Sequence, residues 1–343
     1  MKHQFRNDYS CLAYWHYLNV IKDLNREGQQ GAYGHDVHSK NAAEYIKRTF
    51  ACPNAEVHFL AGGTQTNLAF ISYALRPYEA VIAAESGHIN VHEAGAIEGT
   101  GHKIVTVEPV NGKVTAEAVE KLFAQPIDEH VAVPKMVFIS NATETGTIYT
   151  ANELRALRET CDRHGLYLYV DGARLGYALM SEASDLGPAE FASYCDAFYV
   201  GGTKNGMPLG EALVLVNPEF HGRFRNHMKN RGAMLAKTYL IGFFFEEAFT
   251  NRLYWDIALE TDRIADYLAG CLFGLDIELV GDSPTNQIFV RMEEDKARKV
   301  MEEYGCELWE VTPKGWIIRF VVDHTTTAQD VDELIAYLRE LIA

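Results

Sequence analysis

The sequence has few cysteines and no apolar run long enough to cross a membrane. Its six cysteines are scattered along 343 residues without a Cys-x-x-Cys pair, which excludes a disulfide framework and a cysteine-rich metal site. No window reaches the ~18 unbroken apolar residues of a membrane helix, and residues 1–15 lack an apolar signal core. These absences predict a soluble, cytoplasmic protein with reduced thiols.

Basic residues are too few to balance the acidic ones. The chain has 31 lysines and arginines against 47 aspartates and glutamates, a formal net charge of −16. Such a balance disfavours nucleic acid and anionic membranes as partners, although a small anion can still bind in a locally basic pocket. Hydrophobic residues make up 48% of the chain, as in a globular protein with a substantial core. We therefore expect a small-molecule substrate.

Short apolar runs alternate with helical stretches through the first two thirds of the chain. Near-continuous apolar strands separated by helices indicate a mostly parallel sheet that is buried on both faces. The last two runs are too close together for a parallel crossover, so this pair is predicted to be antiparallel. The predicted strands of this seven-stranded sheet are 56–60, 80–85, 103–108, 135–140, 166–173, 197–202 and 211–216.

After about residue 232 the pattern changes to long helices followed by a smaller unit. This unit alternates strand-like and helical segments and ends in a helix over 327–342 that opens with a threonine cap. The chain therefore predicts an α/β fold in two parts. Residues 1–245 form a large α/β domain that includes a short N-terminal segment, and residues 246–343 form a small C-terminal α+β domain.

Chemically distinctive side chains follow several predicted strands. Lys204 follows "AFYVGG", Asp171 ends "LYLYVD", and His88 follows "AVIAAESG". Ligands of open parallel sheets bind beyond these strand ends. Each residue also has an ordinary interpretation, as a solvated lysine, a turn-capping carboxylate or a surface histidine. His88 and His92 are four residues apart but lack a third ligand, so no metal site is predicted.

Two further features suit anions. The segment "AGGTQTN" ends a strand and begins a helix, whose free N–H groups suit a phosphate, although a glycine turn capped by Thr64 is the commoner meaning. Arg319 lies within the apolar run "WIIRFVV" and must be paired or face an anion. A phosphate cradle, a carboxylate, a flat ring, a lysine and arginines together form the set that holds pyridoxal phosphate. In such a set the lysine binds the aldehyde and the aspartate keeps the pyridine nitrogen protonated.

The chain resembles the low-specificity L-threonine aldolase group of the β-eliminating lyase family, which are fold type I pyridoxal-phosphate enzymes. The resemblance runs from "FRNDYS" to "IIRFVVDHTTTAQDVDELI", and its most specific motifs are "DGARLG" and "GGTKNG". "HINVHEAGA" and the segment around Arg319 add to it. Where the family usually has Ser-Gly-Thr, this chain has "GGT", so one side-chain donor to the phosphate is missing.

The resemblance implies a fold type I architecture with pyridoxal 5′-phosphate as the cofactor. It makes Lys204 the residue that binds the cofactor and Asp171 the partner of the pyridinium. His88 becomes the residue that stacks on the ring and the first candidate for the catalytic base. The resemblance also implies that Gly63, Thr64 and Gln65 bind the phosphate of the cofactor, and that Asn141 or Thr143 lies near its phenolic oxygen. It further implies that Arg174 and Arg319 bind the substrate carboxylate. His35 and His92 are implied in substrate binding or proton transfer.

The implied reaction is retro-aldol cleavage of a β-hydroxy-α-amino acid, such as L-threonine, L-allo-threonine or phenylserine, to glycine and an aldehyde. Two alternatives stay open. One is β-elimination or transamination of another amino acid with the same cofactor, and the other is a doubly wound protein that binds a nucleotide phosphate at "GGTQTN". The resemblance also implies a homodimer or homotetramer, and the apolar segment 240–249 indicates a need for cover by a neighbouring chain.

Overall fold

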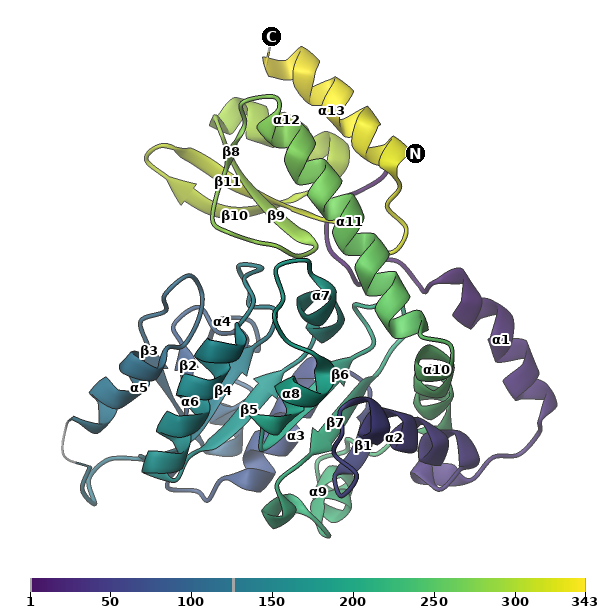
Figure 1. Cartoon of the computed structure of the whole chain (residues 1–343), viewed down its shortest axis with the longest axis vertical. Coiled ribbons are helices and arrows are strands. Elements are labelled where there is room, and N and C mark those ends of the chain that lie inside the picture. Colours follow the sequence, from purple (N-terminus) through teal and green to yellow (C-terminus); the bar gives the residue numbers. More distant parts are fainter. Residues whose placement is uncertain (1, 125–126, 343) are drawn as a thin grey trace.

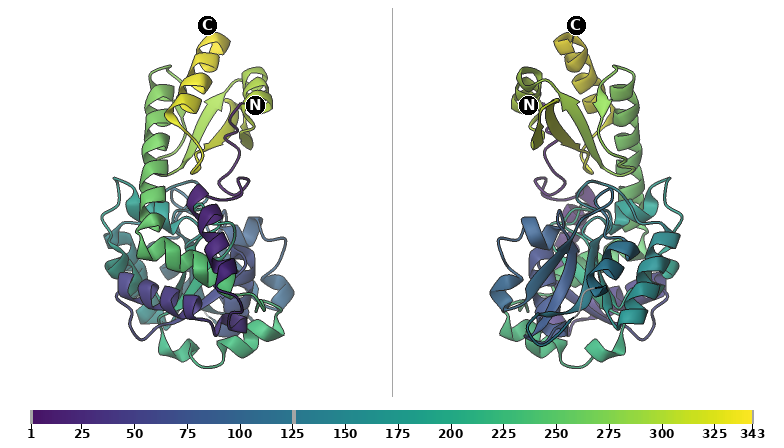
Figure 2. Two further views of the ribbon diagram at one scale, coloured as in Figure 1. Left: turned by 90° about the vertical axis from the view of Figure 1, so that its right-hand side faces the viewer. Right: turned by 90° about the vertical axis from the view of Figure 1, so that its left-hand side faces the viewer.

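Two sheets of different size lie at opposite ends of an elongated molecule (Figures 1 and 2). The structure is a computed structural model that describes residues 2–124 and 127–342. Over these residues the large sheet has seven strands in the order β1-β7-β6-β5-β4-β2-β3, and the small sheet has four in the order β10-β11-β9-β8. Helix α11 (Leu253–Phe273) runs from one end toward the other.

The strands of the large sheet form where the apolar runs predicted them. All run in parallel except β7, which is antiparallel to β1 and to β6, so the antiparallel prediction for the last two runs is confirmed. The carboxyl ends of the parallel strands consequently meet at one edge. The strands are β1 (Glu56–Leu60), β2 (Glu79–Ala84), β3 (Lys103–Val107), β4 (Val133–Ser140), β5 (Tyr167–Asp171), β6 (Ala197–Gly201) and β7 (Glu211–Leu215).

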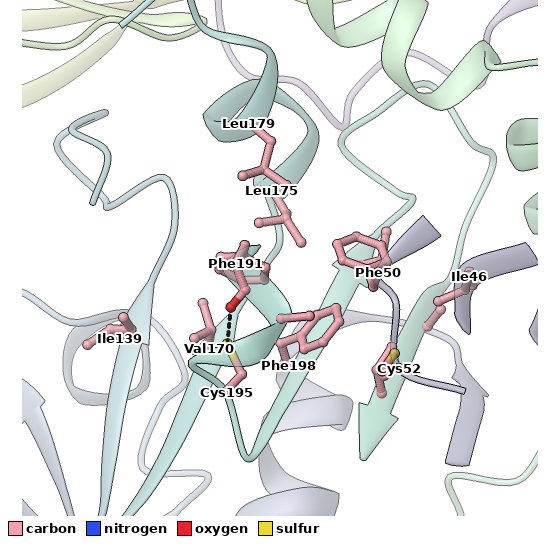
Figure 3. Packing of buried hydrophobic residues seen from close by; sticks show 14 of the residues in the cluster. Ile46, Phe50, Cys52, Ile139, Val170, Leu175, Leu179, Phe191, Cys195 and Phe198 are labelled. Carbon is pink, nitrogen blue, oxygen red and sulfur yellow. Dashed lines mark hydrogen bonds between the residues drawn. The ribbon is translucent and has the colours of Figure 1, made fainter. Parts of the chain in front are cut away.

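Helices cover both faces of the large sheet, which is why its strands are apolar on both sides. On one face Phe198 of β6 packs against Phe50 and Phe191, with ring centroids 4.9 and 5.3 Å apart (Figure 3). On the other face Phe70 and Phe224 belong to a second core. The first face is covered by α6 (Ala151–His164), α7 (Leu175–Met180), α8 (Pro188–Ser193) and α10 (Tyr239–Thr250), with α5 (Ala116–Phe123) beside α6, and the second by α3 (Gly63–Ala74) and α9 (Phe224–Asn230).

The apolar segment 240–249 is covered within its own chain. It lies in α10, and its phenylalanines Phe243, Phe244 and Phe245 are buried in the first core. Helix α2 (Val37–Thr49) packs closely against α10, since a Cβ at Gly242 would lie 2.3 Å from the hydroxyl oxygen of Ser39. Segment 240–249 therefore needs no cover by a neighbouring chain, and this part of the prediction is wrong. The oligomer itself stays a prediction.

The small sheet and its helices confirm the predicted α+β pattern after α11. Thr327 caps the last helix, since its hydroxyl accepts a hydrogen bond from the N–H of Asp330 at 3.3 Å. The short strand β8 was not predicted, because two residues carry no periodic signal. The elements are β8 (Glu278–Leu279), β9 (Gln287–Met292), α12 (Glu294–Tyr304), β10 (Glu307–Thr312), β11 (Gly315–Val321) and α13 (Ala328–Ile342).

The N-terminal segment joins the two parts of the molecule. Phe5 is buried in the core of the small sheet, and its carbonyl accepts a hydrogen bond from the N–H of Val321 at 2.9 Å. The chain then passes to α1 (Trp15–Arg26), which packs against α10 on the outside of the large part of the molecule. The predicted division after residue 245 falls inside α10 and stays a prediction. Among the described residues, no helix combines the length and apolarity needed to span a bilayer.

Candidate active site

A cavity of about 460 Å³ lies at the edge where the parallel strands of the large sheet end. Lys204 follows β6, Arg174 follows β5, and His88 begins the short helix α4 (His88–Val91) after β2. Arg319 of β11 and Trp309 of β10 line the same cavity from the small sheet. The fold thus brings together Lys204, His88 and the two arginines that the sequence singled out.

Lys204 faces this cavity from a tightly packed turn. Its carbonyl oxygen accepts a hydrogen bond from the Tyr177 hydroxyl at 2.7 Å. Burial, together with the charge of Arg174, lowers the pKa of the Lys204 ammonium. A lysine with a lowered pKa is a neutral amine for a larger fraction of the time, and the neutral amine is the form that attacks a carbonyl.

The buried carboxylate of Asp171 is the centre of a hydrogen-bond network. Its Oδ1 accepts from the Tyr199 hydroxyl at 2.5 Å, and its Oδ2 accepts from the Asn67 amide at 2.9 Å. Asn67 also donates to Glu93 at 2.8 Å, and the same Glu93 oxygen lies 2.9 Å from Nδ1 of His88. Asn67, Glu93 and Tyr199 were not predicted as site residues, because a polar residue in a helix or a tyrosine in a strand is ordinary.

The pKa values of the two histidines of the cavity are shifted in opposite directions. Burial opposes protonation of His88, but its hydrogen bond with Glu93 and the charge of Asp171 outweigh burial and raise its pKa. Burial and the adjacent His88 lower the pKa of His92, and the two ring centroids are 5.5 Å apart. The raised pKa of His88 favours the charged ring, which donates hydrogen bonds, whereas the lowered pKa of His92 favours the neutral ring, which can accept a proton.

Ligand atoms of His88, Glu93 and Asp171 lie within 4.8 Å of one another, a spacing that a metal ion could use. The hydrogen bonds of the same groups give them another role. His88 pairs with Glu93, and Asn67 bridges Glu93 to Asp171. We assign the cluster to this network, and it was not apparent as a cluster in the sequence.

Helix α3 begins directly after β1 without a side-chain cap. The N–H groups of Gly63, Thr64 and Gln65 have no acceptor among the described residues, as is usual for the first turn of a helix. A Cβ at Gly63 would lie 2.9 Å from the Tyr199 hydroxyl, so glycine permits the bond between Tyr199 and Asp171. Free N–H groups at the start of a helix fit the phosphate end of the expected cofactor.

Three of the predicted residues form other contacts. The Thr143 hydroxyl lies 2.7 Å from that of Thr147, and Oδ1 of Asn141 accepts from a backbone N–H at 3.2 Å. His35 lies 3.2 Å from Nη2 of Arg225 and is not part of the lining of the cavity that the described residues form. The roles implied for Asn141, Thr143 and His35 stay predictions, and the structure adds no support for them.

Both arginines of the cavity already have carboxylate partners. Arg174 donates from Nε and Nη2 to the two oxygens of Asp8, at 2.8 and 3.0 Å. Arg319 donates from Nη1 to Gln287 at 3.0 Å and from Nη2 to Glu307 at 2.5 Å. Its Nε is buried without a partner in the described part of the chain. Burial and the proximity of Arg174 lower the pKa of Arg319, so the two guanidinium groups repel each other across the cavity.

Two buried carboxyl groups near Lys204 gave no signal in the sequence. Oε1 of Glu144 accepts hydrogen bonds from the Ser140 hydroxyl at 2.7 Å and from the backbone N–H of His88 at 3.0 Å. Burial raises the pKa of Glu144. Burial raises the pKa of Glu211, at the start of β7, to about 8. This shift favours the protonated, neutral form of Glu211. From the sequence, either residue is equally compatible with a solvent-exposed position.

The fold defines the class of protein. The sheet order, with Asp171 and Lys204 at strand ends, is that of fold type I pyridoxal-phosphate enzymes, and aspartate aminotransferase from Thermus thermophilus shares this fold at 17% identity with a TM-score of 0.71. Residues 25–304 match the family described as Beta-eliminating lyase. The chain belongs to this family, as its motifs predicted.

Threonine aldolases are among its similar proteins. The low specificity L-threonine aldolase of Pseudomonas aeruginosa is 29% identical over 98% of this chain and 97% of its own length. That of Saccharomyces cerevisiae is 24% identical over 80% of this chain and 72% of its own. The solved structure of Leishmania major threonine aldolase is 38% identical, covers 99% of this chain and 100% of its own, and gives a TM-score of 0.96.

The Asp8–Arg174 pair yields a prediction about stability. Burial raises the pKa of Asp8, but Arg174 and Lys204 outweigh burial and lower it. The stabilisation is therefore present above the unfolded-state pKa and is lost as the pH falls through the lower folded-state value. Asp8→Asn leaves Arg174 buried without its anion, and we expect a loss of about 3 kcal/mol in urea unfolding at neutral pH.

A double-mutant cycle checks this prediction. Arg174→Met should reduce the free energy of unfolding much less in the Asp8→Asn background than in the wild-type protein. In that background it removes a guanidinium charge that has already lost its carboxylate partner. Strictly additive losses would contradict a coupled pair.

Proposed function

We propose that this protein cleaves β-hydroxy-α-amino acids, such as L-threonine, L-allo-threonine or phenylserine, to glycine and an aldehyde with pyridoxal 5′-phosphate as cofactor. The observation that carries the proposal is the convergence of Lys204, Asp171, Arg174 and Arg319 at one edge of a fold type I sheet. Membership of the β-eliminating lyase family and the similarity to threonine aldolases support it.

The residues present fit the cofactor. Lys204 would hold it covalently, Asp171 would bind its pyridine nitrogen, and the N-terminus of α3 would bind its phosphate. His88 would lie on its ring. When bound, the cofactor supplies an electron sink for the bond that breaks at the α-carbon. The fixed position of Asp171, set by Tyr199 and Asn67, suits a group that must keep a nitrogen protonated.

The arginines select the bond that is broken. Arg174 comes from the large sheet and Arg319 from the small one, and both face the cavity of Lys204. Two guanidinium groups that bind the substrate carboxylate from different sides fix the orientation of the α-carbon. This orientation decides whether the side chain, the α-proton or the carboxylate is lost.

We assign the removal of the β-hydroxyl proton to His92. His88 was the first candidate from the sequence, but its raised pKa and its bond to Glu93 suit a charged donor better than a base. His92 lines the cavity and has a lowered pKa. A neutral imidazole can accept the hydroxyl proton while the Cα–Cβ bond breaks.

An assay of several amino acids for glycine, aldehyde, keto acid and ammonia tests the proposed function. Threonine and allo-threonine should yield glycine and acetaldehyde without ammonia, and borohydride should fix the cofactor to the peptide that contains Lys204. Lys204→Ala should abolish cleavage. Pyruvate and ammonia from serine or cysteine, with no glycine from any hydroxy amino acid, would favour the β-eliminating alternative. A protein that binds no cofactor would favour the nucleotide-binding alternative.

His92 gives a prediction about pH. Its active form is the neutral ring, and its pKa lies below the ordinary value, so the acid limb of kcat should lie below about pH 6.5. His92→Asn should lower kcat roughly 100-fold or more and remove this limb, while the absorbance of bound cofactor stays. His130→Asn, on the exposed surface, is the control. An unchanged profile in His92→Asn would exclude the assignment.

We also propose a homodimer or homotetramer in solution. Trp15 is 61% exposed, Leu18 41% and Ile21 37%, and their spacing of three residues places them along one side of α1. An exposed apolar stripe of this kind suits burial against another chain. Sedimentation equilibrium measures the state directly, and an active monomer at assay concentration would contradict the proposal.

A further inference from the structure

Glu307 forms an ion pair with Arg319, the arginine that lines the cavity from the small sheet. It lies directly opposite Arg319 in the antiparallel register of β10 and β11, and its Oε2 is 2.5 Å from Nη2 of Arg319. The register shifts between Leu308 and Glu310, and such a bulge changes the direction of side chains. Three consecutive residues, Glu307, Leu308 and Trp309, consequently line the cavity.

The carboxylates on the two arginines are held very differently. The side chain of Asp8 is 0% exposed, makes two bonds to Arg174 and accepts a third from Asn286 at 2.9 Å. The side chain of Glu307, on the edge strand of the small sheet, is 37% exposed, and its polar contact among the described residues is the one with Arg319. Glu307 can therefore leave by side-chain rotation, whereas Asp8 cannot leave without breaking a buried network.

Arg319 keeps its position without Glu307. Its Nη1 is bound to Gln287, which is fully buried and itself donates to a backbone carbonyl at 3.3 Å. The guanidinium also lies over the ring of Trp309, 5.1 Å from the centroid. Two partners other than Glu307 thus fix the orientation of this side chain.

The free edge of Arg319 matches a carboxylate. Nε is buried without a partner among the described residues, and Nη2 is bound only by Glu307. These adjacent nitrogens form the edge that binds two carboxylate oxygens at once, and Glu307 uses half of it. A substrate carboxylate that entered beside Glu307 and Asp8 would place three anions against two guanidinium groups, and unbalanced charge is costly in a partly buried cavity.

We propose that Glu307 is a displaceable placeholder for the substrate carboxylate. It neutralises Arg319 while the cavity is free of substrate and is expelled when the α-carboxylate of an amino acid takes both nitrogens. Glu307 thereby lowers the affinity for ligands that carry a carboxylate and leaves the affinity for ligands without one unchanged. The inference rests on the proposed function for the identity of the substrate.

Calorimetric titration of the holoenzyme with glycine tests this role. Glu307→Gln keeps the size of the side chain and removes the competing charge, so the Kd of glycine should fall about 10-fold. Glu310→Gln is the matched control, because Glu310 is an exposed acid of the same strand with no ion pair among the described residues. Its Kd should stay within about twofold of the wild-type value. Glycine methyl ester, which has no carboxylate, should bind all three proteins equally.

The direction in which the Kd of glycine changes decides whether Glu307 competes with the substrate carboxylate or orients Arg319 for it. Unchanged glycine binding in Glu307→Gln would overturn the proposal, since Glu307 would then not compete with the carboxylate. Weaker binding would also overturn it, since it would mean that Glu307 orients Arg319 for the substrate. An equal gain in Glu310→Gln, or with the ester, would also overturn it, since net charge alone would then explain the effect. Tighter glycine binding in an enzyme that does not cleave threonine would reject the proposed reaction and support the role of Glu307.

Discussion

The hydrogen bonds to the buried Asp171 carboxylate fix the arrangement of the whole site. Tyr199 donates from the neighbouring strand and Asn67 from helix α3, so β5, β6 and α3 are held around one anion. The free N–H groups at the start of α3 owe their position to the same contacts. Asn67 extends the constraint to Glu93 and from there to His88. A single buried charge therefore orders the groups expected at the nitrogen, the phosphate and the face of the cofactor.

The opposite side of the cavity depends on contacts between the two sheets. Asp8 of the N-terminal segment binds Arg174 after β5 and Asn286 before β9. Arg319 comes from the small sheet and is close enough to Arg174 to affect its own pKa. The contacts that join the two parts of the molecule thus also shape the carboxylate site. Any change in the relative position of the sheets alters the distance between the guanidinium groups.

The sequence predicted those features that interrupt a local pattern. Lys204 and Asp171 end strongly apolar runs, and Arg319 lies within one, so each was recognisable as an exception. Asn67 and Tyr199 fit their own helix and strand, and their role arises only because β5, β6 and α3 are neighbours in space. Segment 240–249 is apolar on all sides, and only the packing of α2 explains why it needs no other chain. Local pattern thus predicted the fold and singled out the candidate residues for the cofactor, whose roles stay predictions, whereas the supporting contacts depend on tertiary structure.

The choice of reaction lies in the cavity wall and not in the fold. The aspartate aminotransferase of Thermus thermophilus has the same fold at 17% identity, so the fold does not by itself determine which bond is broken. Retro-aldol cleavage needs a base for a hydroxyl proton in addition to a carboxylate clamp. The wall of this cavity holds His92, whose pKa is lowered, beside Arg174 and Arg319, the arginines that we propose as this clamp. Glu307 already pairs with Arg319, and in the role that we propose for it, a substrate carboxylate binds only as the Glu307 side chain moves away.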